Sequence, residues 1–209
     1  MLYELPDEPT LINNIIDTYN QSTPAEISQG YSWYETAHIF ALGLSEHADI
    51  TLRQSAGIIA ALSPQTSWAL NQVMATDLVT NGTTHGLPLS VSRATAILHS
   101  ATENDPFPDP LEILGGPKVR SFYANILDPY TANAVTIDRH AHAIAIGHVP
   151  STQEAKTLDR KGYYERCAAA YIQLADTLKM LPHELQAITW ITHRRQKGIV
   201  DYHTDMEEF

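Results

Sequence analysis

Apolar residues recur along most of the chain at intervals of three and four, the spacing that places them on one face of an α-helix. Leu11, Ile12, Ile15 and Ile16 show this spacing in the first such segment. No run alternates between polar and apolar residues for long enough to indicate a β-strand, and no segment repeats at a fixed interval. The sequence therefore predicts an all-α fold.

Capping and helix-breaking residues divide this pattern into separate helices. Thr51 and Ser67 are residue types that cap helix N-termini, Pro64 interrupts a helix, and Gly147 is typical of a helix C-terminus. Residues 81–89 and 103–110 are expected to be loops. We expect helices at residues 10–19, 31–44, 51–61, 68–79, 90–99, 118–127, 138–147, 163–178 and 182–195, with short turns at 111–114 and 152–159.

The length and composition suit a globular helical protein. A chain of 209 residues with 44% apolar and 8% aromatic residues can bury a core in one domain or in two lobes. Its apolar runs are far shorter than the roughly twenty residues that a membrane span requires, and no signal peptide is visible. We expect a cytoplasmic protein, monomeric and without a membrane partner. The single cysteine, Cys167, excludes an internal disulfide and a four-cysteine iron–sulfur cluster.

Two charged residues that lie twenty positions apart carry the main functional signal. Lys118 follows the turn Gly115, Gly116 and Pro117 and opens a helix, and Asp138 begins the next helix after an apolar lead-in. Taken singly, the lysine would be a surface charge and the aspartate a helix N-cap. Together they are the two groups needed to attack a sugar C1′ and to stabilise the charge that develops there. Their order favours chemistry on a nucleoside.

This arrangement resembles the helix-hairpin-helix, Gly/Pro-rich loop, aspartate (HhH-GPD) superfamily of DNA glycosylases, which includes endonuclease III and the 8-oxoguanine glycosylases. In lyase-competent members of that superfamily a hairpin precedes a catalytic lysine, and a catalytic aspartate follows at a similar spacing. Lys118 matches the lysine, Asp138 the aspartate, and His140 a histidine two residues later. Gly115 and Gly116 belong to a turn that replaces the usual hairpin and is shorter.

Two further segments extend the resemblance over roughly residues 30–197. Residues 58–68 are similar to an early turn whose side chains enter the DNA duplex, and residues 185–190 are similar to a closing helix that packs over the pocket. The resemblance implies a single domain, residues 1–209, of two helical lobes with the active site in the cleft between them, and a helix-hairpin-helix-like element. The expected inner lobe comprises residues 51–127, and the expected outer lobe comprises residues 1–50 and 128–209.

The resemblance also implies a mechanism, and we predict no cofactor for it. Lys118 would attack C1′ as a neutral amine to form a Schiff base, while an ionised Asp138 would stabilise the positive charge on the deoxyribose. Because the base must leave the stack to react, a side chain has to fill the gap. The candidates for filling the gap or contacting the base are Gln65, Trp68 and Asn71. The other candidates for DNA contacts are Gly116, Arg120, Arg139 and His140.

The net charge of −11 opposes binding to nucleic acid, because affinity for a duplex comes largely from neutralised phosphates. The charge is unevenly distributed, however. Residues 1–92 contain one basic residue against nine acidic ones, whereas residues 93–197 contain twelve basic residues against eleven acidic ones. A local basic face is therefore compatible with DNA as the partner, but the composition does not predict a tight general DNA binder.

Ten histidines raise the alternative of a metal site. Asp138 and His142 would share one face of a helix, whereas His140 would point elsewhere, and His148 completes the possible set. A zinc site usually needs three or four nitrogen or sulfur ligands, so we predict no metal. We expect His142 to pack in or near the core and His140 to border the cleft.

Three functions follow from these patterns. The first is a DNA glycosylase, with associated β-lyase activity, that removes a damaged or modified base through Lys118 and Asp138. The second is a glycosylase-like enzyme that acts in the hypermodification of DNA bases, as the superfamily is thought to do in some viruses. The third is a noncatalytic helical module that binds nucleic acid.

Overall fold

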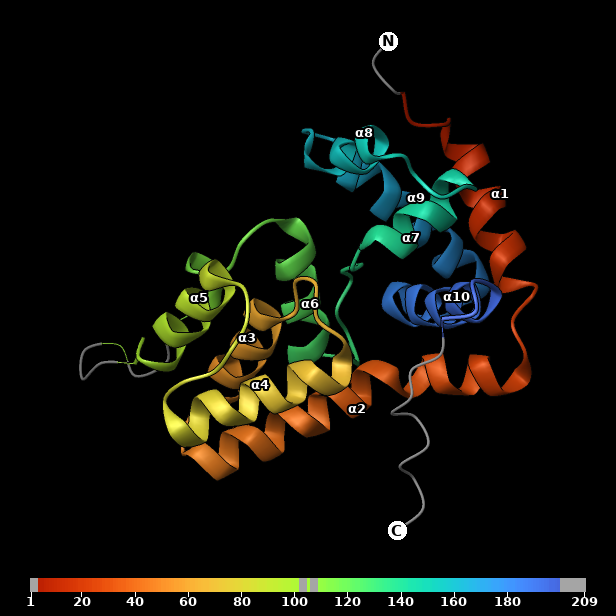
Figure 1. The fold of residues 1–209 in the computed structure, drawn as a ribbon. Helices are drawn as coiled ribbons and strands as arrows, with labels where there is room; N and C mark the ends of the chain where they lie inside the picture. Colours follow the sequence, from red (N-terminus) through yellow and green to blue (C-terminus); the bar gives the residue numbers. More distant parts are fainter. Residues whose placement is uncertain (1–3, 102–104, 106–108, 200–209) are drawn as a thin grey trace. The chain divides into compact units, whose positions relative to one another are not determined.

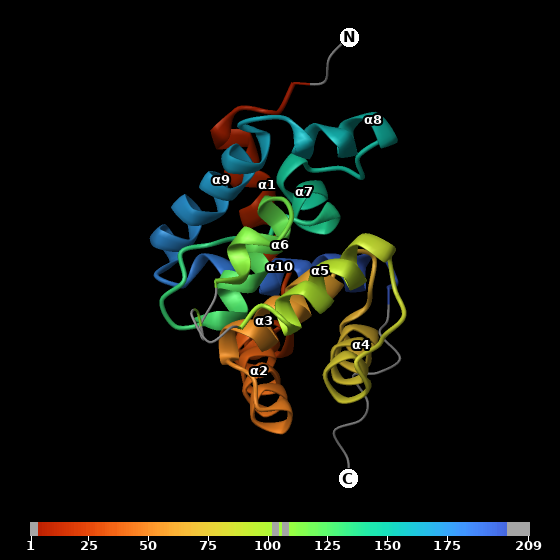
Figure 2. The same ribbon diagram turned by 90° about the vertical axis from the view of Figure 1, so that its left-hand side faces the viewer.

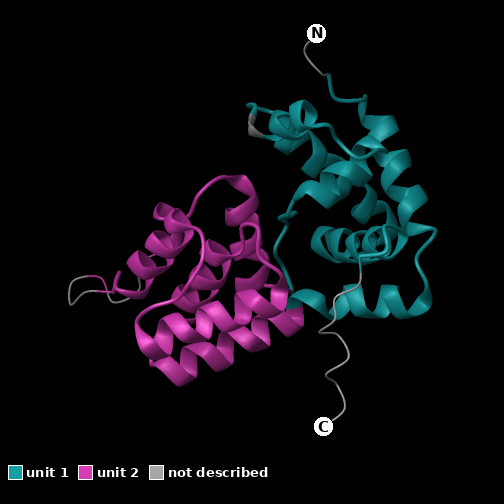
Figure 3. Cartoon of the chain, in the orientation of Figure 1, with its two compact units in different colours: residues 1–34, 130–209 teal, residues 35–129 magenta. Residues whose placement is uncertain are grey.

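The computed structural model describes residues 4–101, 105 and 109–199. These residues form ten α-helices and two short 3₁₀ helices, and they contain no β-strand (Figures 1 and 2). The prediction of an all-α protein is confirmed. The chain divides into two compact units, one formed by residues 1–34 and 130–209 and the other by residues 35–129 (Figure 3). We call them unit 1 and unit 2.

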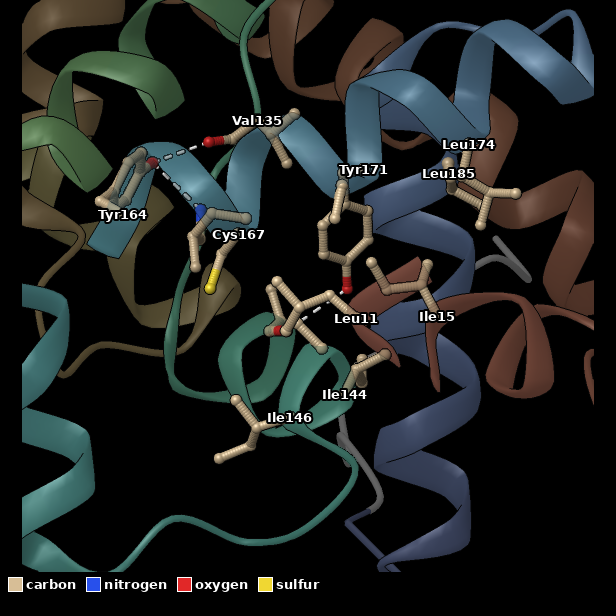
Figure 4. Close-up of a cluster of buried hydrophobic side chains, with 14 of the residues drawn as sticks. Leu11, Ile15, Val135, Ile144, Ile146, Tyr164, Cys167, Tyr171, Leu174 and Leu185 are labelled. Atoms are coloured by element: carbon tan, nitrogen blue, oxygen red, sulfur yellow. Dashed lines mark hydrogen bonds between the residues drawn. The ribbon is translucent and has the colours of Figure 1, made fainter. Parts of the chain in front are cut away.

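Unit 1 has a core that several of its helices share. Helix α1 contacts α7, α9 and α10, and α10 contacts α7 and α9. The core includes Leu11, Ile15, Ile144, Tyr171 and Leu185, all buried (Figure 4). The elements of unit 1 are α1 Glu8–Tyr19, the first part of α2 Pro24–Ala48, α7 Arg139–Ile146, α8 Thr152–Ala155, η2 Lys156–Asp159, α9 Tyr163–Leu178 and α10 Pro182–Gln196.

Unit 2 is organised around α3, which is buried from Gln54 through Leu62. This helix contacts α4, α5, α6 and η1. At Gly57 an added Cβ would lie 2.7 Å from the side chain of Pro110, so η1 can approach α3 only because this residue is glycine. The remaining elements of unit 2 are the second part of α2, α3 Leu52–Leu62, α4 Trp68–Asn81, α5 Pro88–Leu98, η1 Pro110–Glu112 and α6 Pro117–Leu127.

Local capping explains where these helices begin. Thr51 caps α3 and forms a capping box with Gln54, and Ser67 caps α4, as the sequence predicted. Helix α2 instead begins at Pro24, so the predicted start at residue 31 was wrong. The backbone N–H of Thr23 donates to Glu26 Oε2 at 2.7 Å, and the N–H of Glu26 donates to Thr23 Oγ1 at 3.3 Å. This reciprocal pair caps the helix, and proline is compatible with its first turn.

The unit boundaries differ from the expected lobe boundaries, because residues 35–50 and 128–129 belong to unit 2. Helix α2 contributes to both units. The hydroxyl of Tyr34 donates to Gln186 Oε1 of α10 at 2.9 Å, within unit 1. One turn later, His38 Nδ1 lies 2.8 Å from the carbonyl oxygen of Ile126 in α6, within unit 2. A single uninterrupted helix thus changes its packing partners along its length, and periodicity alone does not reveal where.

Glycine also permits the contact between α2 and α10 in unit 1. An added Cβ at Gly30 would lie 2.3 Å from the side chain and 2.7 Å from the backbone of Ile188. Ile188 is fully buried, so it has no room to move away. Helix α10, which carries Trp190, is therefore held by close backbone packing. None of the described helices combines the length and the apolar character needed to cross a lipid bilayer.

Candidate functional site

The segment that leads into Asp138 lies outside the helices and is buried. Val135 and Ile137 are 2% and 1% exposed. The hydroxyl of Tyr164, from α9, donates to the carbonyl oxygen of Val135 at 2.7 Å and accepts from the N–H of Ile137 at 3.1 Å (Figure 4). One phenol thus satisfies two buried backbone groups of a segment that has no strand partner. Helix α9 thereby fixes the backbone immediately before Asp138.

The carboxylate of Asp138 accepts hydrogen bonds on both oxygens. Oδ1 accepts from the backbone N–H groups of His140 at 2.9 Å and Ala141 at 2.8 Å, which is the geometry of an N-cap on α7. Oδ2 accepts from the indole Nε1–H of Trp190 at 3.0 Å. The N-cap interpretation therefore accounts for one oxygen only. The second oxygen is held by a residue that is 52 positions away on α10.

Aromatic rings and a guanidinium surround the indole that holds Asp138. The guanidinium carbon of Arg194 lies 4.3 Å from the centroid of the Trp190 ring. The rings of His140 and Trp33 meet it edge to face, with centroids at 6.2 Å and 6.4 Å. The His193 ring lies 5.6 Å from that of His140. We call these five residues, which come from α2, α7 and α10, the Trp190 cluster.

The two histidines of the Trp190 cluster, His140 and His193, have different surroundings. Burial lowers the pKa of His193, and the neighbouring His140 and Lys197 lower it further, while Asp138 opposes the shift. Arg139 donates from Nε to Nε2 of His140 at 3.2 Å. Nε2 of His140 thus acts as the acceptor of a bond from Arg139, whereas His193 is close enough to Asp138 for the carboxylate to affect its pKa.

In unit 2, the predicted lysine lies in the first turn of a helix. Gly116 is the N-cap residue of α6, Pro117 is the first helical residue, and Lys118 follows it, half-buried. Arg120 donates from Nε to the carbonyl oxygen of Gly115 at 3.0 Å. This bond stabilises the turn that contains Gly115 and Gly116. Arg120 therefore has a structural role that the sequence did not indicate.

The three residues expected to contact a base differ in exposure. Gln65 is exposed and has a φ of +59°, in the left-handed region that residues other than glycine rarely occupy. Trp68 is half-buried and meets Phe40 edge to face at 5.8 Å. Asn71 is only 2% exposed and donates to the carbonyl oxygen of Ile59 at 3.0 Å. Asn71 therefore links α4 to α3, and of the three only Gln65 is exposed.

The predicted residues fall into two groups. Those in unit 1 are Asp138, Arg139 and His140, and those in unit 2 are Gln65, Trp68, Asn71, Gly116, Lys118 and Arg120. The resemblance placed residues 185–190 over the pocket, but no sequence argument paired Trp190 with Asp138 or grouped His193 and Arg194 with it. Their spacing of three and four positions puts them on one face of α10, which is the signal that could have drawn attention to them.

The alternative of a metal site has no geometric support. The described part of the chain contains no group of three or more His, Cys, Asp or Glu residues that could hold a metal ion. His142 is fully buried, and neither of its ring nitrogens has a hydrogen-bond partner. Its expected place in the core is confirmed, and burial lowers its pKa. His148 instead pairs with Glu154, with Nε2 and Oε1 3.0 Å apart.

The fold and the site define an all-α protein of two units with a carboxylate held between a helix N-terminus and an indole. The chain belongs to a protein family of unknown function, DUF7178, whose sequence model matches residues 6–197. No curated protein and no solved structure matches the chain.

Proposed function

We propose that the protein is a DNA glycosylase, with associated β-lyase activity, that removes a damaged or modified base. The observation that carries this proposal is the carboxylate of Asp138, which accepts three hydrogen bonds from fixed donors. The spacing of twenty residues to Lys118 and the resemblance to HhH-GPD glycosylases add to it. We also propose that the chain has the fold of the HhH-GPD glycosylases.

Asp138 has the properties needed to stabilise a cationic sugar. When the N-glycosidic bond breaks, the departing base takes the electron pair and positive charge develops on the deoxyribose. A carboxylate that is already oriented by its hydrogen bonds stabilises this charge without first having to reorganise. The N-terminus of α7 and the indole of Trp190 supply those bonds. The helix dipole also favours a negative charge at this position.

Lys118 is the proposed nucleophile. Its amine nitrogen would form a bond to C1′ as the bond from C1′ to the base breaks, and the sugar ring would then open to a Schiff base. Loss of the C2′ proton and departure of the 3′ phosphate would cleave the strand by β-elimination. Lys118 lies in the first turn of α6 and is half-buried, and its attack on C1′ requires the neutral amine.

An acidic protein would hold DNA through few phosphate contacts. Arg195 is engaged with Glu26, with Nε 2.6 Å from Oε1, and Arg120 is bonded to its own turn. Arg139 is exposed at the start of α7, next to Asp138, and is the best candidate for a phosphate contact. Such a surface suits an enzyme that binds DNA weakly and acts on one extruded base.

The second candidate function is a glycosylase-like step in DNA base hypermodification. The net charge of −11 favours this function over general repair. A repair enzyme has to search undamaged DNA, and nonspecific affinity for DNA comes from basic residues that neutralise phosphates. Such an enzyme would keep Asp138 and Lys118 and differ in the base it accepts.

Borohydride trapping on a panel of duplexes tests the proposal. Each duplex carries one damaged or modified base, and reduction converts a Schiff base into a stable cross-link between protein and DNA. We expect a cross-link on at least one duplex, with release of the free base detected in parallel. If no duplex loses a base and none is trapped, the protein is not a glycosylase, and retained binding would favour the noncatalytic nucleic-acid-binding module.

A further inference from the structure

We infer that Trp190 is a positioning residue for Asp138, and that its indole N–H holds the carboxylate in the orientation used in base release. The inference rests on the proposed function. Its structural basis is the bond of 3.0 Å from Trp190 Nε1 to Asp138 Oδ2. Helix α7 already engages Oδ1 through two backbone N–H groups. The indole therefore fixes the one oxygen that the helix leaves unheld.

The three bonds suit an ionised carboxylate. An indole N–H is a donor and has no acceptor capacity, and the two backbone N–H groups of α7 that meet Oδ1 are donors as well. Hydrogen bonds from such donors are stronger to a carboxylate than to a neutral acceptor, and the carboxylate is the form that stabilises a cation.

The rest of the cluster fixes the indole. Arg194, one turn further along α10, lies over the ring with its guanidinium carbon 4.3 Å from the ring centroid. A cation over an indole face is attracted to the ring quadrupole. Trp33 and His140 meet the same ring edge to face. Contacts from three helices therefore restrict its rotation, and the close packing of Gly30 on Ile188 restricts α10 itself.

Nuclear magnetic resonance tests the contact without reference to activity. The chain contains three tryptophans, so protein labelled with nitrogen-15 has three indole N–H signals to assign. The signal lost in Trp190→Phe belongs to Trp190. We expect Asp138→Asn to displace this signal while that of Trp68, in the other unit, stays in place. An unchanged Trp190 signal in Asp138→Asn would overturn the inference, whether or not the protein excises a base.

Kinetics then test positioning. Trp190→Phe keeps an aromatic ring but removes the N–H, so we expect single-turnover base release to fall roughly ten- to a hundred-fold, the scale of one hydrogen bond to a charged group. Duplex affinity should stay as in wild type. A rate that falls while duplex affinity is unchanged separates positioning from a merely structural role.

Trp33→Phe is the matched control, because it makes the same exchange at a neighbouring tryptophan, keeps an aromatic ring at that position and leaves the bond between Trp190 and Asp138 in place. We expect it to lower the rate of base release far less than Trp190→Phe does. If wild type releases a base and Trp190→Phe matches its rate, the inference fails while the proposed function stands. If wild type releases no base from any duplex, the proposed function fails, and the indole signals still decide the contact.

Discussion

The phenol of Tyr164 lies 2.7 Å from the carbonyl oxygen of Val135, three residues before Asp138. Its oxygen also accepts from the backbone N–H of Ile137. A buried segment that lies outside the helices has no regular hydrogen-bonding ladder to satisfy its backbone groups, and buried backbone groups that lack partners are costly. A side chain of α9 takes that role here, so the position of the candidate site depends on the packing of unit 1.

Tyr164→Phe should therefore destabilise the protein without creating a large cavity. The buried N–H of Ile137 and carbonyl of Val135 would each lose a partner. We expect a loss of about 1–3 kcal/mol in the free energy of unfolding, measured with urea. Tyr31→Phe is the control, since Tyr31 is 44% exposed and its change should have little effect. Equal stability of the two variants would show that the phenol contributes no net stability.

Local sequence signals located most helix starts because a cap involves residues only three positions apart. Thr51 and Ser67 accept from the backbone three residues ahead, as their types predict. The same signal was present at Thr23 and Glu26, but Pro24 suggested a break instead. Proline ends a helix only when it falls in the interior, and in the first turn it is favourable.

The candidate site was only partly accessible from sequence for a different reason. The cap formed by Asp138 on α7 is local, and its residue type and place indicated it. The bond from Trp190 joins residues 52 positions apart, and it exists because α10 packs against α7. No periodicity in a single chain determines which helices pack together. The resemblance of residues 185–190 to a closing helix and the spacing of Trp190, His193 and Arg194 along α10 indicated a shared face, but not the bond to Asp138.

Lys118→Ala should abolish borohydride trapping on any duplex that traps the wild-type protein, because no other residue is proposed to form the Schiff base. Base release would then fall or depend on water as the nucleophile. Lys161→Ala, which alters an exposed lysine, is the matched control and should trap normally. Circular dichroism of both variants checks that the helices are retained. Undiminished trapping by Lys118→Ala would remove this lysine from the mechanism.

Asp138→Asn should slow single-turnover base release by roughly two orders of magnitude, the scale typical of losing a preorganised electrostatic group. Asparagine still caps helices, so the fold should be retained. Its amide has a single oxygen, however. If that oxygen faces α7, the amide nitrogen meets the Trp190 N–H donor to donor.

Asp7→Asn provides the control for this substitution. Asp7 caps α1 and accepts from the N–H of Thr10 at 3.0 Å, so it loses the same charge at an equivalent helix position. We expect its base release to match wild type. If Asp138→Asn releases the base at the wild-type rate, Asp138 acts only as a helix cap.

Buried histidines should make the fold less stable in acid. Burial lowers the pKa of His142 below the usual value of 6.5, and burial is also the main cause of the lowered pKa of His193. Below about pH 6.5 the unfolded chain binds protons that the folded chain does not. The free energy of unfolding should therefore be highest above about pH 6.5. It should fall as the pH drops from 6.5 towards the pKa values that these histidines have in the folded protein.

His142→Leu should reduce this loss. Both ring nitrogens of His142 lack hydrogen-bond partners, so an apolar side chain also removes buried polar atoms. We expect a smaller difference in unfolding free energy between pH 7.5 and pH 5.5 than in wild type, with His193 responsible for part of what remains. The control is His85→Gln, because His85 is exposed. An unchanged pH dependence in His142→Leu would exclude His142 as a source of acid sensitivity.

Binding to DNA should depend on few phosphate contacts, so the slope of affinity against salt should be shallow. Arg139→Gln removes an exposed cation beside Asp138 and should weaken binding to all sequences to a similar extent, with a slope lower by about one. Arg166→Gln makes the same change in net charge on α9, where Arg166 donates to the carbonyl oxygen of Pro6, and should preserve the slope. Gln65→Ala should instead change which base is accepted, because Gln65 is the exposed residue of the predicted base contacts. If Arg139→Gln binds with the affinity and slope of wild type, Arg139 makes no phosphate contact, and if no duplex binds at low salt, DNA is not the partner.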